Sequence, residues 1–83
     1  MKYEDLFAQR ILSLCKKRGI TVNKPATMSG IHQSTLDNIV RGISKNPRIM
    51  ILHKIANTFN MTVSEFLDFK EFNDYSFDDN NES

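Results

Sequence analysis

The chain has 83 residues and a formal net charge of +1, and its composition, 40% hydrophobic, suits a single small domain with one core. A lone cysteine, Cys15, excludes an internal disulfide, and no metal-ligand spacing joins it to His32 or His53. No apolar run approaches the ~20 residues of a membrane helix, and the first residues are too acidic for an export signal. We therefore expect a cytoplasmic protein without a metal or cofactor.

The small net charge combines two regions of opposite sign. Residues 1–67 contain ten Lys and Arg against four Asp and Glu, a net charge of +6, whereas residues 68–83 contain one Lys against six acids, a net charge of −5. A domain with a net charge of +6 suits a polyanion as its partner, and an acidic tail would compete with that partner for the basic surface. We divide the chain into a domain at residues 1–70 and an acidic, partly disordered tail at residues 71–83.

Apolar spacing predicts the first helix from about Tyr3 to Lys17, and its inner-face residues are Phe7, Ile11 and Leu14. The second helix is expected to begin at Thr21 as its cap, and Ala26 provides the small side chain needed where another helix crosses. Pro25 would then be its fourth residue, where proline removes about one hydrogen bond and disfavours helical geometry at Lys24. We therefore expect an irregular first turn.

A tight turn is predicted at Gly30, because glycine readily takes the positive φ that ends a helix. The third helix follows at about residues 33–41, with Gly42 closing it, and its inward residues are Ile31, Leu36 and Ile39. Its outward residues are Gln33, Ser34, Asp37, Asn38 and Arg41. Two short helices joined by a tight turn, the second with a polar outer face, are typical of a DNA-reading helix-turn-helix.

Two more helices complete the prediction. The fourth runs from Pro47 to Phe59 with Asn46 as its cap, and its inward residues are Leu52, Ile55, Ala56 and Phe59. Thr62 with Glu65 forms a capping box at the start of the fifth helix, flanked by Met61 and Phe66 as a hydrophobic staple. No segment shows the alternation of a strand, so the fold class is all-α.

The segment from Ile11 to Leu67 resembles the Cro/C1-type (XRE) helix-turn-helix family of phage repressors and small bacterial regulators. The matching elements are Arg18-Gly19-Ile20-Thr21, Ala26, Gly30-Ile31, Ser34-Thr35-Leu36, Gly42, Lys45-Asn46-Pro47, Leu52, Ile55-Ala56 and Ser64-Glu65-Phe66-Leu67. The resemblance implies a five-helix lambda-repressor-like domain that binds double-stranded DNA sequence-specifically. It implies a transcriptional regulator, and we expect a repressor that binds as a homodimer.

The sequence departs from the family pattern in three respects, the first of which involves a pair of positions. Cys15 and Val40 stand where relatives often pair an Arg with a Glu, so we predict that the two are near neighbours in the core. Cys15 is then a buried, inert residue rather than an exposed redox sensor. Pro25 replaces a leucine, and Val22 replaces a glutamine that in relatives touches a phosphate and braces a base-reading side chain. Valine can do neither.

The exposed face of the third helix supplies the predicted DNA contacts. The base readers are Gln33, Ser34, Asp37 and Asn38, and Gln33 has the donor and acceptor that match adenine. Asp37 could accept from cytosine or simply pair with Arg41 four residues on. The phosphate contacts are Thr21, Asn23, Lys24, His32, Thr35, Arg41, Lys45, Asn46 and Arg48.

His32 precedes the third helix, where a capping or phosphate-binding role is favoured over a pH switch. The sequence contains no set of Ser, His and acid, no pair of catalytic carboxylates and no glycine-rich phosphate loop. We therefore expect a protein that is not an enzyme.

Aromatic residues recur every three positions at the start of the tail, from Phe66 to Tyr75. Together with apolar residues left on the outside of the fourth helix, they suggest a dimer interface formed by Met50, Ile51, Phe69 and Phe72. The alternative is that the tail folds over its own domain. The alternative function is a protein-binding, antitoxin-like module whose acidic aromatic tail binds a partner protein.

Overall fold

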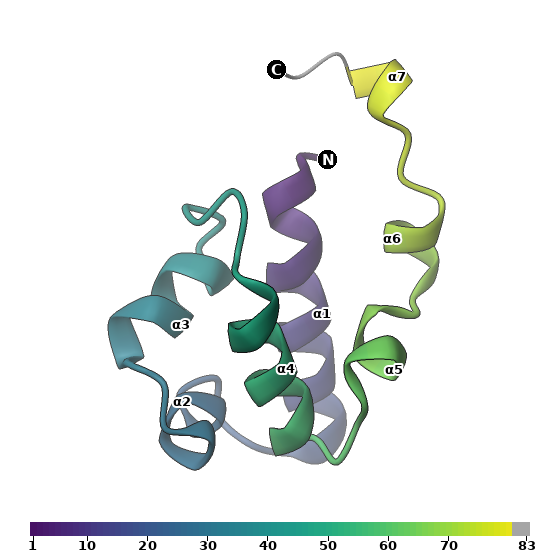
Figure 1. The fold of residues 1–83 in the computed structure, drawn as a ribbon. Helices are drawn as coiled ribbons and strands as arrows, with labels where there is room; N and C mark the ends of the chain where they lie inside the picture. Colours follow the sequence, from purple (N-terminus) through teal and green to yellow (C-terminus); the bar gives the residue numbers. More distant parts are fainter. Residues whose placement is uncertain (81–83) are drawn as a thin grey trace.

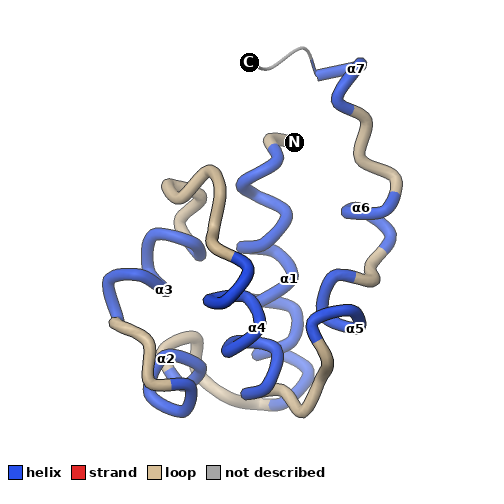
Figure 2. The backbone as a smooth tube through the Cα atoms, viewed as in Figure 1, coloured by secondary structure: helices blue, strands red, loops and turns tan. Residues whose placement is uncertain are grey.

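The computed structural model describes residues 1–80, which form helices joined by short connections and contain no strand (Figures 1 and 2). The helices are α1 (Tyr3–Arg18), α2 (Lys24–Ser29), α3 (Gln33–Val40), α4 (Ile49–Thr58), α5 (Val63–Leu67), α6 (Lys70–Asn73) and α7 (Phe77–Asn80). This arrangement confirms the all-helical, five-helix prediction, with α6 and α7 as additional single turns in the tail. Within the described residues, no helix has the length and apolarity needed to cross a membrane.

One hydrophobic core joins the first five helices. α1 packs against α3, and α4 packs against both α2 and α5. The largest fully buried side chains are Phe59, Phe66, Leu6, Ile11, Leu36, Ile39, Ile55 and Pro25, and none of the buried side chains in the described part of the chain is polar or charged. The predicted inner faces of the first and fourth helices are all buried, which confirms their apolar periodicity.

The capping box at α5 is present as predicted. The Thr62 hydroxyl accepts a hydrogen bond from the Glu65 backbone N–H at 3.0 Å, and the Glu65 carboxylate accepts one from the Thr62 backbone N–H at 2.8 Å. Two N–H groups that the helix itself leaves unpaired are thereby satisfied. A box of this kind is encoded within four residues, which is why the sequence alone placed the start of this helix.

Two helix starts differ from the prediction. α2 begins at Lys24 with Asn23 in the N-cap position, so Thr21 is not the cap. This start places Pro25 in the first turn, where its missing N–H would have had no partner within the helix. α4 begins at Ile49 after an extended Arg48, so neither Asn46 nor Pro47 opens it. The Arg48 carbonyl accepts hydrogen bonds from the N–H groups of Ile51 and Leu52.

Two arginines of α1 hold the C-terminal ends of later helices. Arg10 donates from Nε to the Phe66 carbonyl at 2.8 Å and from Nη2 to the Glu65 carbonyl at 2.9 Å. Arg18 donates from Nη2 to the Phe59 carbonyl at 2.7 Å. The Glu65 carbonyl also accepts from the Asp68 backbone N–H at 3.2 Å, and all three carbonyls lie at a helix end, where the regular pattern of backbone hydrogen bonds stops. Burial lowers the pKa of Arg10 despite the opposing charge of Asp68, and an arginine still remains protonated.

The aromatic part of the tail lies against the first turn of α1. The Tyr3 ring centroid is 6.1 Å from that of Phe72, 5.2 Å from Tyr75 and 5.4 Å from Phe77. These contacts are the ones expected if the tail folds over its own domain, which is the alternative to a dimer interface. The partial disorder expected for residues 71–83 stays a prediction, and residues 81–83 of that range lie outside the described residues.

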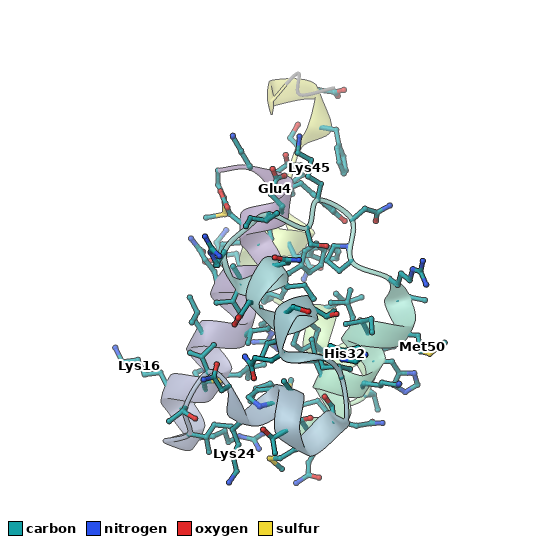
Figure 3. The ribbon with its side chains drawn as sticks, turned by 90° about the vertical axis from the view of Figure 1, so that its left-hand side faces the viewer. Glu4, Lys16, Lys24, His32, Lys45 and Met50 are labelled. Carbon is teal, nitrogen blue, oxygen red and sulfur yellow. The ribbon has the colours of Figure 1, made fainter. Side chains whose placement is uncertain are left out.

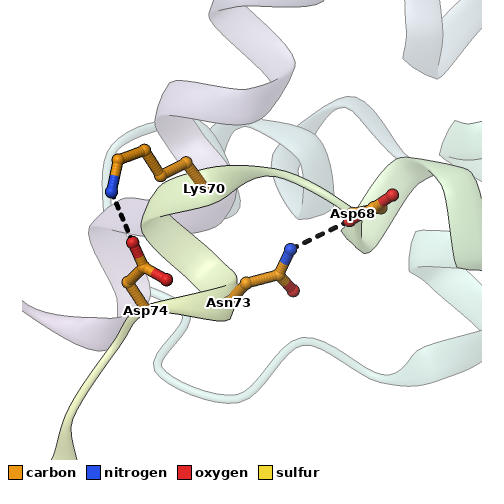
Figure 4. A network of polar contacts seen from close by, with 4 residues as sticks. All are labelled: Asp68, Lys70, Asn73 and Asp74. Atoms are coloured by element: carbon orange, nitrogen blue, oxygen red, sulfur yellow. Dashed lines mark hydrogen bonds and ion pairs between the residues drawn. The ribbon is translucent and has the colours of Figure 1, made fainter.

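Polar side chains contact one another around the single turn of α6 (Figure 4). Lys70 forms an ion pair with Asp74, and Asn73 donates from Nδ2 to the Asp68 carboxylate at 2.9 Å. The hydrogen bond that Lys70 donates to the Asp74 carboxylate is the main cause that raises the pKa of Lys70. The ion pair is exposed to solvent, so it adds little to stability.

Candidate nucleic-acid interface

The turn between α2 and α3 is built around Gly30, as predicted. Its φ of 77° lies in the left-handed region, and its N–H donates to the Ala26 carbonyl at 3.0 Å, which closes α2. Ala26 itself is buried, and its small side chain allows α2 and α3 to approach closely. The turn sets the angle at which α3 leaves α2.

α3 has one buried face and one exposed face. Leu36 and Ile39 are buried and Ile31 is partly buried against the same core. The four predicted base readers, Gln33, Ser34, Asp37 and Asn38, are all exposed. The structure therefore brings these four side chains together on the solvent face of one eight-residue helix, while their contacts with bases stay predictions.

Gly42 follows the end of α3, and two physical reasons favour glycine at this position. Its φ is 73°, and a Cβ at this position would lie 2.7 Å from the Asp5 carboxylate on α1. The Asn38 carbonyl then accepts from the N–H groups of Ile43 and Ser44 as the chain turns away. The loop that follows is thus held close to the N-terminal end of α1.

A polar cluster that the sequence did not reveal lies at the start of α3. Gln33 donates from Nε2 to Asn23 Oδ1 at 2.8 Å and to Asp37 Oδ1 at 3.1 Å. Val22 cannot brace Gln33, but Asn23, the next residue, does. The sequence feature that could have revealed this contact is Pro25, two positions after Asn23. The proline moves the start of α2 and leaves Asn23 in the N-cap position.

Asp37 is not paired with Arg41. Among the side chains of residues 1–78 the ion pair of Lys70 with Asp74 is the only one, so the alternative of an Asp37–Arg41 pair is wrong. The Gln33 amide, four residues earlier on the same face, already donates to the Asp37 carboxylate. Arg41 therefore keeps its charge available at the C-terminal end of α3.

Cationic side chains surround the exposed face of α3. Figure 3 looks onto the α2–α3 side of the molecule, with Lys24 and Lys45 toward opposite ends and His32 between them. Arg41, Lys45 and Arg48 are exposed around the end of α3 and the following loop. Beside them lies an open recess of about 310 Å³, and its lining includes Thr35, Asn46 and Arg48.

Other predicted contact residues have mixed outcomes. Thr21, Asn23 and Lys24 are exposed near the start of α2. His32 occupies the N-cap position of α3, but its side chain makes no capping hydrogen bond, so the capping role is wrong. Its imidazole lacks the short side-chain oxygen that usually caps a helix. The phosphate contacts proposed for all these residues stay predictions.

Cys15 is buried, as predicted, and burial raises the pKa of its thiol. This environment disfavours the reactive thiolate. Val40 is partly buried against the same core, whereas its direct contact with Cys15 stays a prediction. Among the described side chains of residues 1–78, no cluster of three or more His, Cys, Asp and Glu residues is placed to hold a metal ion.

The predicted dimer residues are divided between two environments. Met50 is 64% exposed on α4, and Ile51 beside it is partly buried. The rings of Phe69 and Phe72 lie 5.6 Å apart, and Phe72 also contacts Phe7 at 5.8 Å. The two phenylalanines therefore take part in the internal aromatic packing, and the interface itself stays a prediction.

Two short helices that cross at a glycine turn, with the second helix exposing its polar face among unpaired cations, define a helix-turn-helix domain. Comparison with known families agrees with this class. Residues 10–71 match the model of the Cro/C1-type HTH DNA-binding domain. The chain belongs to this family.

Similar proteins include two regulators of Bacillus subtilis (strain 168). The chain is 37% identical over 60 residues to the HTH-type transcriptional regulator SlrR, covering 71% of this chain and 40% of SlrR. It is 30% identical over 70 residues to the HTH-type transcriptional regulator SinR, covering 84% of this chain and 63% of SinR. The chain thus spans less than two thirds of either relative.

Solved structures support the same fold. The prophage Lp1 protein 11 superposes with a TM-score of 0.79 at 30% identity, covering 90% of this chain and 100% of that protein. An HTH_3 family transcriptional regulator from Vibrio cholerae superposes with a TM-score of 0.68 at 30% identity, covering 87% of this chain and 38% of that protein. Both comparisons extend over most of the helices described above.

Proposed function

We propose that the protein is a sequence-specific transcriptional repressor that reads the major groove of double-stranded DNA with α3 and blocks transcription by occupying its site. The observation that carries this proposal is the exposed polar face of α3, flanked by cations without ion-pair partners in the described chain. The relatives named as transcriptional regulators support it. The exposed face of α3 carries both hydrogen-bond donors and acceptors, and such groups can pair with the base edges in the major groove.

The contacts divide into readers and anchors. Gln33, Ser34, Asp37 and Asn38 face the bases. Arg41, Lys45 and Arg48 hold the phosphate backbone on one side of α3, and the remaining backbone contacts come from Thr21, Asn23, Lys24, His32, Thr35 and Asn46. Anchors set the register of the helix in the groove and carry no sequence information themselves.

Selection from a random duplex library tests the function directly. We expect an enriched inverted repeat whose half-sites lie about one helical turn, ~34 Å, apart. The same experiment supplies the operator for the measurements below. Recovery of unenriched sequences only, at an ionic strength where the protein still binds DNA, would refute sequence-specific recognition.

A pair of substitutions separates reader from anchor. Gln33→Ala is expected to cost about 1–3 kcal/mol on the selected site and to relax the preference at one base pair. Lys45→Ala is expected to weaken binding to all sequences alike, because it removes a phosphate contact. Titrations of both variants on the selected and a scrambled duplex measure the difference. A harmless Gln33→Ala would show that this face does not read the site.

The repressor acts as a homodimer on DNA, with Met50 and Ile51 of α4 at the interface. Support comes from Met50, a large apolar side chain that is 64% exposed. Met50→Glu is expected to lower the mass of the DNA complex from two chains to one in light scattering, because dimerisation would bury the new carboxylate. Met28→Glu, on an α2 residue that is 56% exposed, is the matched control. Equal masses for both variants would contradict this interface.

A further inference from the structure

The carboxamide of Gln33 has both of its donor positions occupied. Nε2 carries two hydrogens, and it donates to Asn23 Oδ1 at 2.8 Å and to Asp37 Oδ1 at 3.1 Å. The orientation of the amide follows from chemistry, because a carboxylate only accepts hydrogen bonds and the NH2 group must therefore face Asp37. The carbonyl oxygen Oε1 is the atom of this group left for another partner.

The two partners hold Gln33 from different elements. Asn23 lies in the N-cap position of α2, and Asp37 lies four residues further along α3. Lys24 and His32, the chain neighbours of Asn23 and Gln33, lie on the same side of the molecule in Figure 3. Contacts from two directions restrict the side-chain torsions of Gln33 before any ligand arrives, which lowers the entropic cost of using it.

We propose that Asn23 and Asp37 are positioning residues that restrict Gln33 to accepting a hydrogen bond from its base. Adenine N6 and cytosine N4 are amino donors in the major groove, whereas guanine O6 and thymine O4 are acceptors. An acceptor-only Gln33 therefore selects adenine or cytosine against guanine or thymine. This inference rests on the proposed function and makes it more specific.

This readout differs from the adenine contact expected from the glutamine alone. Pairing with adenine at both N6 and N7 requires one amide hydrogen to point at N7. Turning a hydrogen away from Asp37 would leave its carboxylate unpaired beside the base pair and the phosphates. The structure therefore favours one hydrogen bond that adenine and cytosine can both donate.

The test uses the selected duplex with each of the four base pairs at the position that Gln33→Ala relaxes. Wild-type protein is expected to bind the adenine and cytosine duplexes within about threefold of each other, and about tenfold or more tighter than the guanine and thymine duplexes. Asn23→Ala/Asp37→Ala frees both amide hydrogens, and any DNA contact that Asn23 or Asp37 makes elsewhere is lost equally on the four duplexes, because they differ only at this base pair. This variant is expected to prefer adenine over cytosine by about tenfold, because pairing with N6 and N7 becomes possible.

Asn57→Ala, at an exposed position of α4 outside the proposed interface, is the matched control and should leave all four affinities unchanged. Circular dichroism checks that the double variant folds, as expected for two exposed side chains. If it does not fold, the wild-type ranking of the four duplexes decides alone.

Two results would overturn the inference. A wild-type preference for adenine over cytosine of about tenfold or more would mean that the amide donors are released on DNA, and tightest binding to guanine or thymine would mean that Gln33 donates. In both cases sequence-specific binding itself would stand. Absence of any preferred sequence in the library would instead refute the proposed function, and this inference with it.

Discussion

The affinity for DNA is expected to fall about 100-fold per protein chain between ~50 and ~200 mM salt, if each chain neutralises about four phosphates. Lys24, Arg41, Lys45 and Arg48 are exposed and none has an ion-pair partner among the side chains of residues 1–78, so their charges are available to phosphates. Each neutralised phosphate releases counterions and adds about 0.9 to the slope of log affinity against log salt. Fluorescence anisotropy with a labelled duplex over a series of salt concentrations measures this slope.

Two lysines make a matched pair for this experiment. Lys45→Ala should reduce the magnitude of the slope by about one, because one phosphate contact is lost. Lys70→Ala should leave the slope unchanged, because Lys70 lies on α6 and already pairs with Asp74. A flat salt response of the unmodified protein, or an equal effect of both substitutions, would count against the proposed cationic surface.

Leu36→Ala is expected to destabilise the domain by about 2–5 kcal/mol, because it removes a fully buried side chain and leaves a cavity. Leu36 is 0% exposed and attaches α3 to the core. A loss of this size is a large part of the total stability of a small domain. Urea unfolding followed by circular dichroism measures the change.

Leu12→Ala is the control for this substitution, since Leu12 has the same side chain but is 41% exposed on α1. Its cost should stay within about 0.5 kcal/mol. At temperatures where the Leu36→Ala variant unfolds, this variant should lose DNA binding together with its fold. The Leu12→Ala variant should still bind DNA at the same temperatures. Equal unfolding midpoints for the two variants would show that α3 is not held by this contact.

Features that depend on neighbouring residues were predictable from the sequence. The inner faces of α1 and α4 follow from apolar spacing, and the capping box of Thr62 and Glu65 lies within four residues. Gly30 and Gly42 marked the ends of α2 and α3, because both need a positive φ that other residues rarely adopt. Local sterics and short hydrogen bonds decide these features, so their signals are local as well.

Helix starts next to proline were harder to predict. For Pro25 and Pro47, propensity allows several registers for the first turn. The structure begins α2 and α4 at Lys24 and Ile49, later than the predicted caps. The choice depends on which register buries the apolar face of each helix, which only the packed core decides.

By itself the sequence determined the all-helical class, the helix-turn-helix and the residues exposed on α3, because spacing and turn chemistry encode them. Only the tertiary structure decided which distant groups meet. Arg10 reaches the Phe66 carbonyl across 56 positions of sequence, and Asn23 rather than Val22 braces Gln33. The tail rings pack on Tyr3. Such partners depend on how helices cross and where short turns end, and no local pattern of residues specifies that geometry.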